Sequence, residues 1–135
     1  MPLLIDTGPL YALADADDLW HTRVRDFLQK ERRSLIVPVT VVPEAAYLIR
    51  KRLGAFAERS FAESLAAQEI AVENLTTADL RRSRELLEAY EFLGLVDASI
   101  VAIAERLKLT SLITTDRRDF GRVRPRHVRA FELLP

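Results

Sequence analysis

The chain has 135 residues, 49% of them hydrophobic, so it can bury one core but is too short to divide readily into two domains. It contains 20 lysine and arginine residues against 20 aspartate and glutamate residues, and the formal net charge of zero favours no class of partner. The absence of cysteine excludes a disulfide scaffold and a thiolate metal site. No apolar run approaches the roughly 20 residues that a membrane span needs. We therefore expect one domain, residues 1–135, in a soluble, cytoplasmic protein.

The spacing of apolar residues predicts an alternation of short strands and helices. Steps of three or four residues, as from Trp20 to Val24 and Phe27, indicate an amphipathic helix. Short apolar runs bounded by turn residues indicate buried strands. In chain order, we expect a strand at 3–5 that runs into a loop or helix start, a helix at about 19–30, a strand at 35–37, helices at about 40–53 and 55–68, a strand at 70–72, a helix starting at Thr76 or Thr77, a helix after Asp97, a strand at 112–114, a basic loop at 117–126 and an edge strand within 128–133.

This order of elements predicts an α/β fold. Strands that alternate with helices form a three-layer α/β/α domain, here with a mainly parallel central sheet of four to five strands. Thr40 is a suitable N-cap for the helix after the second strand, and Gly54 is a suitable residue to end it. In parallel sheets of this kind, functional sites form beyond the carboxyl ends of the strands.

Four acidic residues fall where these strands end or where a helix begins. Asp6 follows the first strand, Asp116 follows the fourth, Glu44 lies at the start of the helix after the second, and Asp97 precedes a strongly periodic helix. Each has a simpler explanation by itself, because aspartate is common in turns and at N-caps, and glutamate is favourable near a helix N-terminus. Together, however, they bring four carboxylates to one edge of the sheet, where like charges repel strongly unless a cation is bound.

A divalent cation would resolve that repulsion. Mg²⁺ and Mn²⁺ prefer oxygen ligands, and Mg²⁺ usually retains waters that substrate phosphates can replace. Such an ion lowers the pKa of a bound water, and a second ion can stabilise the leaving oxygen of a phosphodiester. We expect Asp6, Asp97 and Asp116 to bind the principal ion, with Glu44 positioning a second ion or the attacking water. His21 and His127 are expected to lie outside this site.

Several neighbouring residues are candidates for supporting roles. Thr7 and Thr115 are candidates for hydrogen bonding to a metal-bound group, with Ser99 as a weaker one. Asp119 is either a fifth acidic ligand or a surface charge. Arg117 and Arg118 either hold phosphates or belong to a solvated loop. They begin a local basic strip of Arg117, Arg118, Arg122, Arg124, Arg126 and Arg129. We expect Trp20 and Phe27 to belong to the core or to a protein interface.

The segments around the four carboxylates resemble the motifs of PIN domains, and among these the VapC toxins of prokaryotic toxin–antitoxin pairs. The resemblance spans nearly the whole chain and rests on residues 4–10 (LIDTGPL), 38–44 (PVTVVPE), 96–102 (VDASIVA) and 112–120 (LITTDRRDF). The chain departs from the family pattern at Asp119, where relatives often carry another residue such as histidine, and at Pro43 before the glutamate.

The resemblance implies a Mg²⁺- or Mn²⁺-dependent endoribonuclease toxin. Such a protein would cleave structured RNA, a tRNA or a ribosomal RNA loop, and thereby stop translation. The resemblance also implies a homodimer, or a heterotetramer or hetero-octamer with a VapB-like antitoxin whose tail blocks the acidic pocket.

Three other interpretations remain. Asp6-Thr7-Gly8 is also the signature of aspartic proteases, which pair two such aspartates, but that class requires an all-β chain and leaves the other carboxylates unused. A phosphate-accepting receiver domain would need a lysine near the end of the fourth strand, which is missing. The third is a catalytically degenerate PIN scaffold that binds RNA or protein, although its carboxylates would then have no function.

Overall fold

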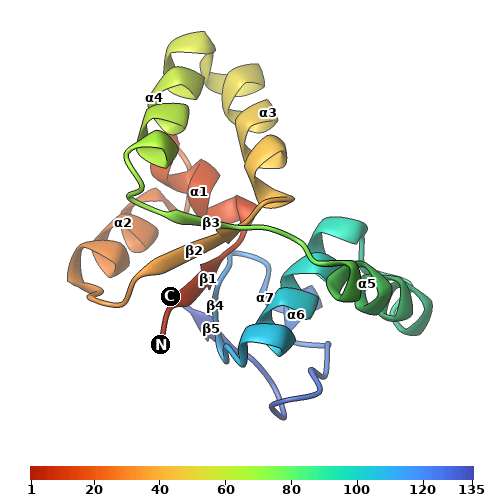
Figure 1. Ribbon diagram of the computed structural model, residues 1–135. Helices are drawn as coiled ribbons and strands as arrows, with labels where there is room; N and C mark the ends of the chain where they lie inside the picture. Colours follow the sequence, from red (N-terminus) through yellow and green to blue (C-terminus); the bar gives the residue numbers. More distant parts are fainter.

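Five parallel strands form the centre of the computed structural model, which describes residues 1–135 (Figure 1). Their order across the sheet is β3-β2-β1-β4-β5, and every neighbouring pair is parallel. The strands are β1 (Leu3–Ile5), β2 (Leu35–Pro38), β3 (Ala71–Glu73), β4 (Ser111–Ile113) and β5 (Glu132–Leu134). The predicted α/β fold with a parallel sheet is thus confirmed, and the last strand lies at an edge as expected.

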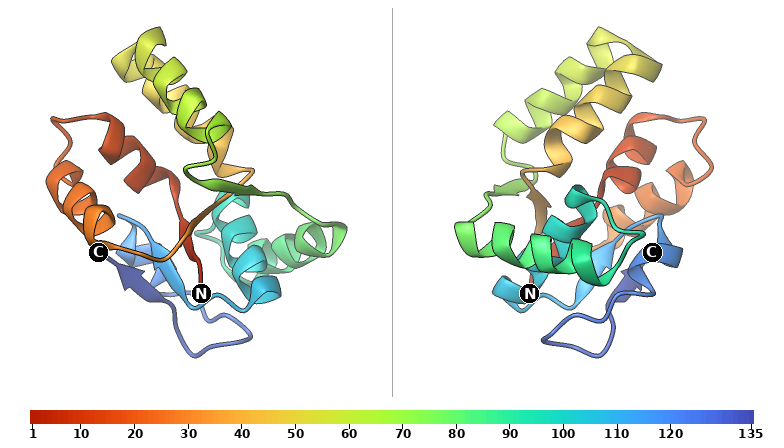
Figure 2. Two further views of the ribbon diagram at one scale, coloured as in Figure 1. Left: turned by 60° about the vertical axis from the view of Figure 1, so that its left-hand side comes forward. Right: turned by 90° about the vertical axis from the view of Figure 1, so that its right-hand side faces the viewer.

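Seven helices surround the sheet. They are α1 (Thr7–Ala14), α2 (His21–Lys30), α3 (Val41–Leu53), α4 (Ala55–Ala66), α5 (Thr77–Ala89), α6 (Leu95–Leu107) and α7 (Arg117–Phe120). Helices α1 and α2 lie on one face and α5 and α6 on the other, while α3 and α4 form a hairpin that extends away from the sheet (Figures 1 and 2). None of these helices has the length and apolar character needed to cross a membrane.

The central strand β1 is buried completely because it has a strand on each side and helices on both faces. Leu4 is paired with Ile36 of β2 and with Leu112 of β4. Both faces of such a strand must be apolar, which explains why β1 is a continuous apolar run rather than an alternating pattern. The residue that follows it, Asp6, is consequently held at the centre of the carboxyl edge.

The local sequence explains where α3 ends and where α5 begins. Gly54 ends α3 with φ of 96°, a conformation that favours glycine. Thr76 begins α5 through a capping box: its side chain accepts the Asp79 N–H, and the Asp79 carboxylate accepts the Thr76 N–H.

The structure differs from the local expectations in three details. Thr40 stands at the N-cap position of α3, but its side chain bonds the Ser99 hydroxyl instead of the helix backbone. Asp97 does not cap α6; Gly94 is the N-cap, and Asp97 lies within the first turn. The basic segment after Asp116 is not entirely a loop, because it begins with the short helix α7, for which Asp116 is the N-cap.

Candidate active site

Asp6 is held in a single orientation at the end of β1. One carboxylate oxygen accepts the Thr7 N–H at 2.7 Å, which caps α1, and the other accepts the Thr114 hydroxyl at 2.9 Å. Its own N–H extends the sheet by donating to the Ile113 carbonyl. Burial, which these hydrogen bonds only partly offset, raises the pKa of Asp6 to about 6, and the negative charges of Glu44 and Asp116 act in the same direction.

Thr7 joins Asp6 to Glu44. Its backbone N–H donates to the Asp6 carboxylate, and its hydroxyl donates to a carboxylate oxygen of Glu44 at 2.5 Å. Glu44 lies in the first turn of α3, where the positive end of the helix dipole favours its charge. The side chain is exposed, so it can reach a ligand in solvent as well as Thr7.

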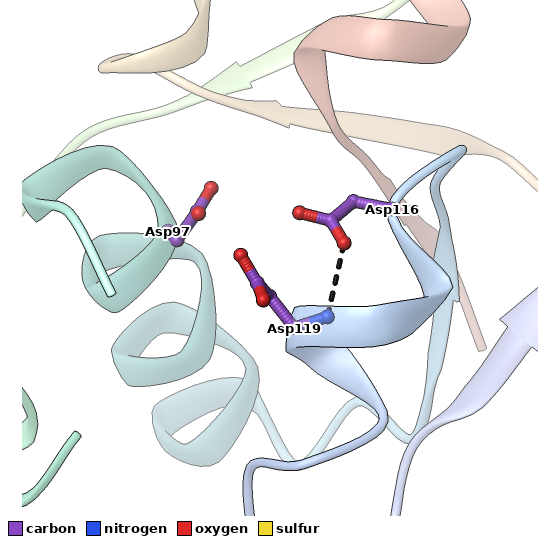
Figure 3. Close-up of side chains that lie close together, drawn as sticks. All are labelled: Asp97, Asp116 and Asp119. Carbon is purple, nitrogen blue, oxygen red and sulfur yellow. Dashed lines mark hydrogen bonds between the residues drawn. The ribbon is translucent and has the colours of Figure 1, made fainter. Parts of the chain in front are cut away.

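The other three carboxylates form a compact cluster on α6 and α7. Asp97, Asp116 and Asp119 each place one carboxylate oxygen within 4.8 Å of the others (Figure 3). An oxygen of Asp116 also accepts the Asp119 N–H at 3.0 Å, which fixes the start of α7. The structure therefore places Asp119 within the acidic group rather than on a separate surface.

Asp97 has the most perturbed carboxyl group in this cluster. The pKa of Asp97 is raised to about 7. Burial is the largest cause, and the negative charges of Asp6, Asp116, Glu44 and Asp119 act in the same direction. All four carboxylates predicted from the sequence, with Asp119 as a fifth, thus interact electrostatically at the same edge of the sheet.

The donor set fits a hard divalent cation. None of the five acidic residues forms an ion pair with a lysine or arginine side chain. An unneutralised group of carboxylate oxygens is the environment that Mg²⁺ and Mn²⁺ favour, and it is costly without a counter-ion.

Thr114 is a residue of this site that sequence reasoning missed. Its hydroxyl donates to Asp6 and accepts the Asp116 N–H at 2.9 Å, so it links two of the predicted ligands. The pairing of Ile5 with Ile113 places Thr114 beside Asp6, a register that no local pattern reveals. The candidate chosen instead, Thr115, makes no hydrogen bond to a carboxylate and packs against Gly8.

The arginines of the basic strip differ in their contacts. Arg126 pairs with Glu85, and Arg122 stacks over the ring of Phe92 at 4.0 Å. Arg117 and Arg118, which follow Asp116 directly, are exposed and form no ion pair with an aspartate or glutamate side chain, although Arg117 donates to the Pro135 oxygen. Both histidines lie outside the acidic cluster, as expected: His21 contacts the Ala12 carbonyl and His127 that of Leu109.

A separate apolar hollow lies between α1 and α4. Its volume is about 460 Å³, and its lining includes Leu10, Leu13, Phe56, Phe61 and Ile70. Phe56 is 75% exposed although it is a large aromatic side chain.

The model of the PIN domain matches residues 3–124. The chain belongs to the PIN domain family. It is also similar to Ribonuclease VapC26 of Mycobacterium tuberculosis, with 30% identity over 135 residues that cover 98% of this chain and 100% of that protein. The chain is thus a homologue of a VapC ribonuclease, and the family resemblance seen in the sequence is confirmed. This family excludes the aspartic protease and receiver interpretations.

Solved structures show the same fold. The Mycobacterium tuberculosis toxin VapC20, described as cleaving the sarcin-ricin loop, superposes with a TM-score of 0.84 at 21% identity, over 94% of this chain and 98% of that one. A toxin–antitoxin complex from Klebsiella pneumoniae superposes with a TM-score of 0.72 at 23% identity, over 90% of this chain and 92% of that one. VapBC2 of Rickettsia felis, bound to a promoter DNA fragment, superposes with a TM-score of 0.71 at 15% identity, over 98% of this chain and 97% of that one.

Proposed function

We propose that this chain is a Mg²⁺- or Mn²⁺-dependent endoribonuclease toxin, one domain long, that cleaves structured RNA in a tRNA or ribosomal RNA loop and so inhibits translation. The observation that carries the proposal is the unneutralised group of Asp97, Asp116 and Asp119 at the carboxyl edge of the sheet, with Asp6 and Glu44 beside it. The similarity to a ribonuclease and to a toxin described as cleaving the sarcin-ricin loop supports the choice of substrate class.

In this proposal Asp6, Asp97 and Asp116 hold the principal ion, Glu44 positions a second ion or the attacking water, and Asp119 is a further ligand. When bound, such an ion would supply an activated water and stabilise charge on the scissile phosphate. The chain's own contribution is preorganisation, because Thr7 and Thr114 hold Asp6 in place from both carboxylate oxygens. Thr114 also fixes the backbone of Asp116.

Arg117 and Arg118 are proposed to hold RNA phosphates next to this site. Both are exposed at the start of α7, directly after Asp116, and neither pairs with an aspartate or glutamate side chain. Arginine is well suited to this role, because its planar guanidinium matches the geometry of phosphate oxygens.

We further propose a VapB-like antitoxin as partner, with a homodimer of the chain or a heterotetramer or hetero-octamer of the two proteins as the assembly. Relatives solved as toxin–antitoxin complexes support this proposal. The apolar hollow with the exposed Phe56 is a surface that a protein partner would cover. Light scattering of the chain alone and of the complex tests the assembly.

The first experiment is incubation of the antitoxin-free protein with total cellular RNA and Mg²⁺ or Mn²⁺, followed by sequencing of the new 5′ ends. We expect discrete cuts that disappear with EDTA and with Asp97→Asn. Glu88→Gln is the matched control, because it removes one negative charge from α5 outside the acidic group. A folded protein that produces no cuts would contradict the proposal and favour a non-catalytic scaffold.

The assignment of ligands needs a separate test. Asp6→Asn, Glu44→Gln, Asp97→Asn and Asp116→Asn should each abolish cleavage and weaken Mn²⁺ binding in calorimetry, while circular dichroism shows an unchanged fold. Cleavage that survives in any two of the four variants would show that the site is wrongly assigned.

A further inference from the structure

One hydrogen bond joins the start of the helix that carries Glu44 to the helix that carries Asp97. The hydroxyl of Thr40, at the N-cap position of α3, lies 2.6 Å from the hydroxyl of Ser99 on α6. The other side-chain hydrogen bonds of α3 go to α1 and α4. The contact between Thr40 and Ser99 is therefore the one side-chain hydrogen bond between the two helices that bring these carboxylates to the edge of the sheet.

The direction of this bond follows from the second contact of Ser99. Its hydroxyl donates to the Val96 carbonyl at 2.6 Å, and a serine hydroxyl has a single hydrogen to donate. Thr40 is consequently the donor, and the Ser99 oxygen is the acceptor. Ser99 is completely buried, so the two bonds form a shielded chain from the start of α3 to the residue directly before Asp97.

The local sequence leaves the Thr40 hydroxyl available for this contact. An N-cap side chain normally accepts the N–H of the second or third helical residue. The second residue of α3, Val42, donates its N–H to the Val39 carbonyl at 3.3 Å, and the third is Pro43, which has no N–H. The proline that precedes Glu44 thus removes one usual partner of Thr40.

The position of Glu44 depends on how the start of α3 is held. Thr40 and Glu44 are four residues apart and lie on the same face of the helix. Thr7 holds the Glu44 carboxylate beside Asp6, whereas only the contact of Thr40 with α6 relates it by a hydrogen bond to the helix of Asp97. The α3–α4 hairpin extends away from the sheet, so a rotation at its base would move Glu44 (Figures 1 and 2). Apolar packing is non-directional, while a hydrogen bond restricts both distance and angle.

We propose that Thr40 and Ser99 are positioning residues for RNA cleavage: their hydrogen bond fixes Glu44 relative to Asp97, and thereby the attacking water relative to the scissile phosphate. This inference rests on the proposed ribonuclease function. Ser99 forms no hydrogen bond with a carboxylate, so the pair acts through the two helices and not by direct contact with the acidic group. Loss of residues that orient the groups of a metal site typically lowers activity by about 10–100-fold.

The kinetics of RNA cleavage test this role. The substrate is a synthetic RNA that carries a cut site mapped in total cellular RNA. Thr40→Val keeps the shape of the side chain but removes the donor, and Ser99→Ala removes the acceptor. Each should lower kcat by about 10-fold and leave KM within about twofold, because alignment of the reacting groups is lost while binding of the RNA is retained.

Two further variants make the test specific. Thr40→Ser retains the hydroxyl and should cleave at nearly the unmodified rate. Ser83→Ala is the matched control for Ser99→Ala, because Ser83 of α5 is also completely buried, but its hydroxyl bonds only the Asp79 carbonyl of its own helix. Its kcat should equal that of the unmodified chain.

A second measurement needs neither metal nor cleavage. The chain has no cysteine, so Glu63→Cys on α4 and Glu88→Cys on α5, both at exposed positions, can be spin-labelled selectively. Helix α5 packs on α6, so the two labels report the orientation of the α3–α4 hairpin relative to α6. In EDTA, pulsed electron paramagnetic resonance should give a broader or shifted distance distribution for Thr40→Val and Ser99→Ala than for the unmodified chain. Thr40→Ser should give the unmodified distribution.

The proposal requires both effects. A change in only one of the two measurements overturns it, and so does an equal loss of kcat in Thr40→Ser or Ser83→Ala, which would indicate general destabilisation. Thermal unfolding of each variant establishes that it is folded under the assay conditions. If the unmodified chain cuts no RNA, the proposed ribonuclease function fails, and the distance measurement still decides whether the pair fixes α3. If the unmodified chain cuts RNA and Thr40→Val cuts it equally fast, the positioning role alone is refuted.

Discussion

Replacing Arg82 with methionine should leave Glu105 as an unpaired, buried carboxylate. Glu105 lies in the last turn of α6 and is only 8% exposed. Its two oxygens accept hydrogen bonds from the Arg82 guanidinium at 2.7 and 3.0 Å, and one of them also accepts the Arg126 N–H at 2.9 Å. This group connects α5, α6 and the segment after α7. Methionine keeps most of the apolar stem of Arg82 and removes only its charge and donors.

The loss of stability follows from the charge left behind. Removing one partner of a buried ion pair costs about 3–5 kcal/mol, because the remaining charge is uncompensated. The Arg126 N–H remains and the Arg82 side chain is 18% exposed, so we expect a value near the lower limit, about 3 kcal/mol. This is a large share of the roughly 5–15 kcal/mol that stabilises a folded domain. The Tm should fall by about 10 °C in a domain of this size.

The pH dependence gives the prediction its direction. Burial opposes ionisation of Glu105, but the hydrogen bonds and positive charges of Arg82 and Arg126 together outweigh it, so the pKa of Glu105 is lowered from its usual 4.5. The pair therefore stabilises the fold above pH 4.5, and that contribution is lost as the pH falls through the lowered pKa. In Arg82→Met, only the N–H and the charge of Arg126 still oppose the effect of burial, so the pKa of Glu105 should be higher than in the unmodified chain. The difference in stability between the two proteins should be largest at neutral pH and should shrink below pH 4.5.

Urea unfolding across this pH range measures the difference. Arg84→Met is the matched control on the same helix, because its ion pair with Glu88 is exposed and should contribute nothing measurable. The double variant Arg82→Met, Glu105→Met should recover most of the loss, since no unpaired charge remains. Equal stability of Arg82→Met and the unmodified chain, or a difference that does not change with pH, would refute the reasoning.

Three further changes test the packing around the site by urea unfolding. Gly8→Ala places a Cβ 2.2 Å from the Thr115 hydroxyl oxygen and should cost about 1–3 kcal/mol, whereas adding Thr115→Ala should restore the stability. Thr114→Val leaves a buried oxygen of Asp6 without its donor and should cost about 1–3 kcal/mol and slow any cleavage, while Thr114→Ser retains both. Thr76→Ala removes the capping box of α5 and should cost about 1 kcal/mol. Thr76→Ser keeps the hydroxyl and should therefore keep the full stability.

Much of the fold could be predicted from local patterns in the sequence. The apolar run at Leu3–Ile5, the helical spacing of the segment from Trp20 to Phe27, the stop at Gly54 and the start at Thr76 all correspond to observed elements. Each depends on forces that act within a few residues, such as side-chain periodicity, backbone conformation and capping. The alternation of these elements was sufficient to predict a parallel α/β sheet with its carboxylates at one edge.

Prediction of hydrogen-bond partners from the local sequence failed where a side chain had a choice of partners. Thr40 and Asp97 both stand near the start of a helix and have the chemistry of an N-cap. Thr40 occupies the N-cap position without a side-chain bond to the helix, and Asp97 lies within the first turn. Thr40 bonds Ser99, which belongs to another helix, and the carboxylate of Asp97 faces those of Asp116 and Asp119 (Figure 3). A hydroxyl or carboxylate binds whichever partner packing brings nearest, and that partner is not encoded by its neighbours in the chain.

The sequence by itself therefore determined the kinds of elements, their order and the set of acidic residues at their ends. Tertiary structure alone decided that Thr114 lies beside Asp6 and that Asp119 joins the acidic cluster. The physical reason is distance along the chain. Helix and strand patterns depend on interactions between close neighbours, whereas strand register and the approach of separate helices depend on how the whole core packs.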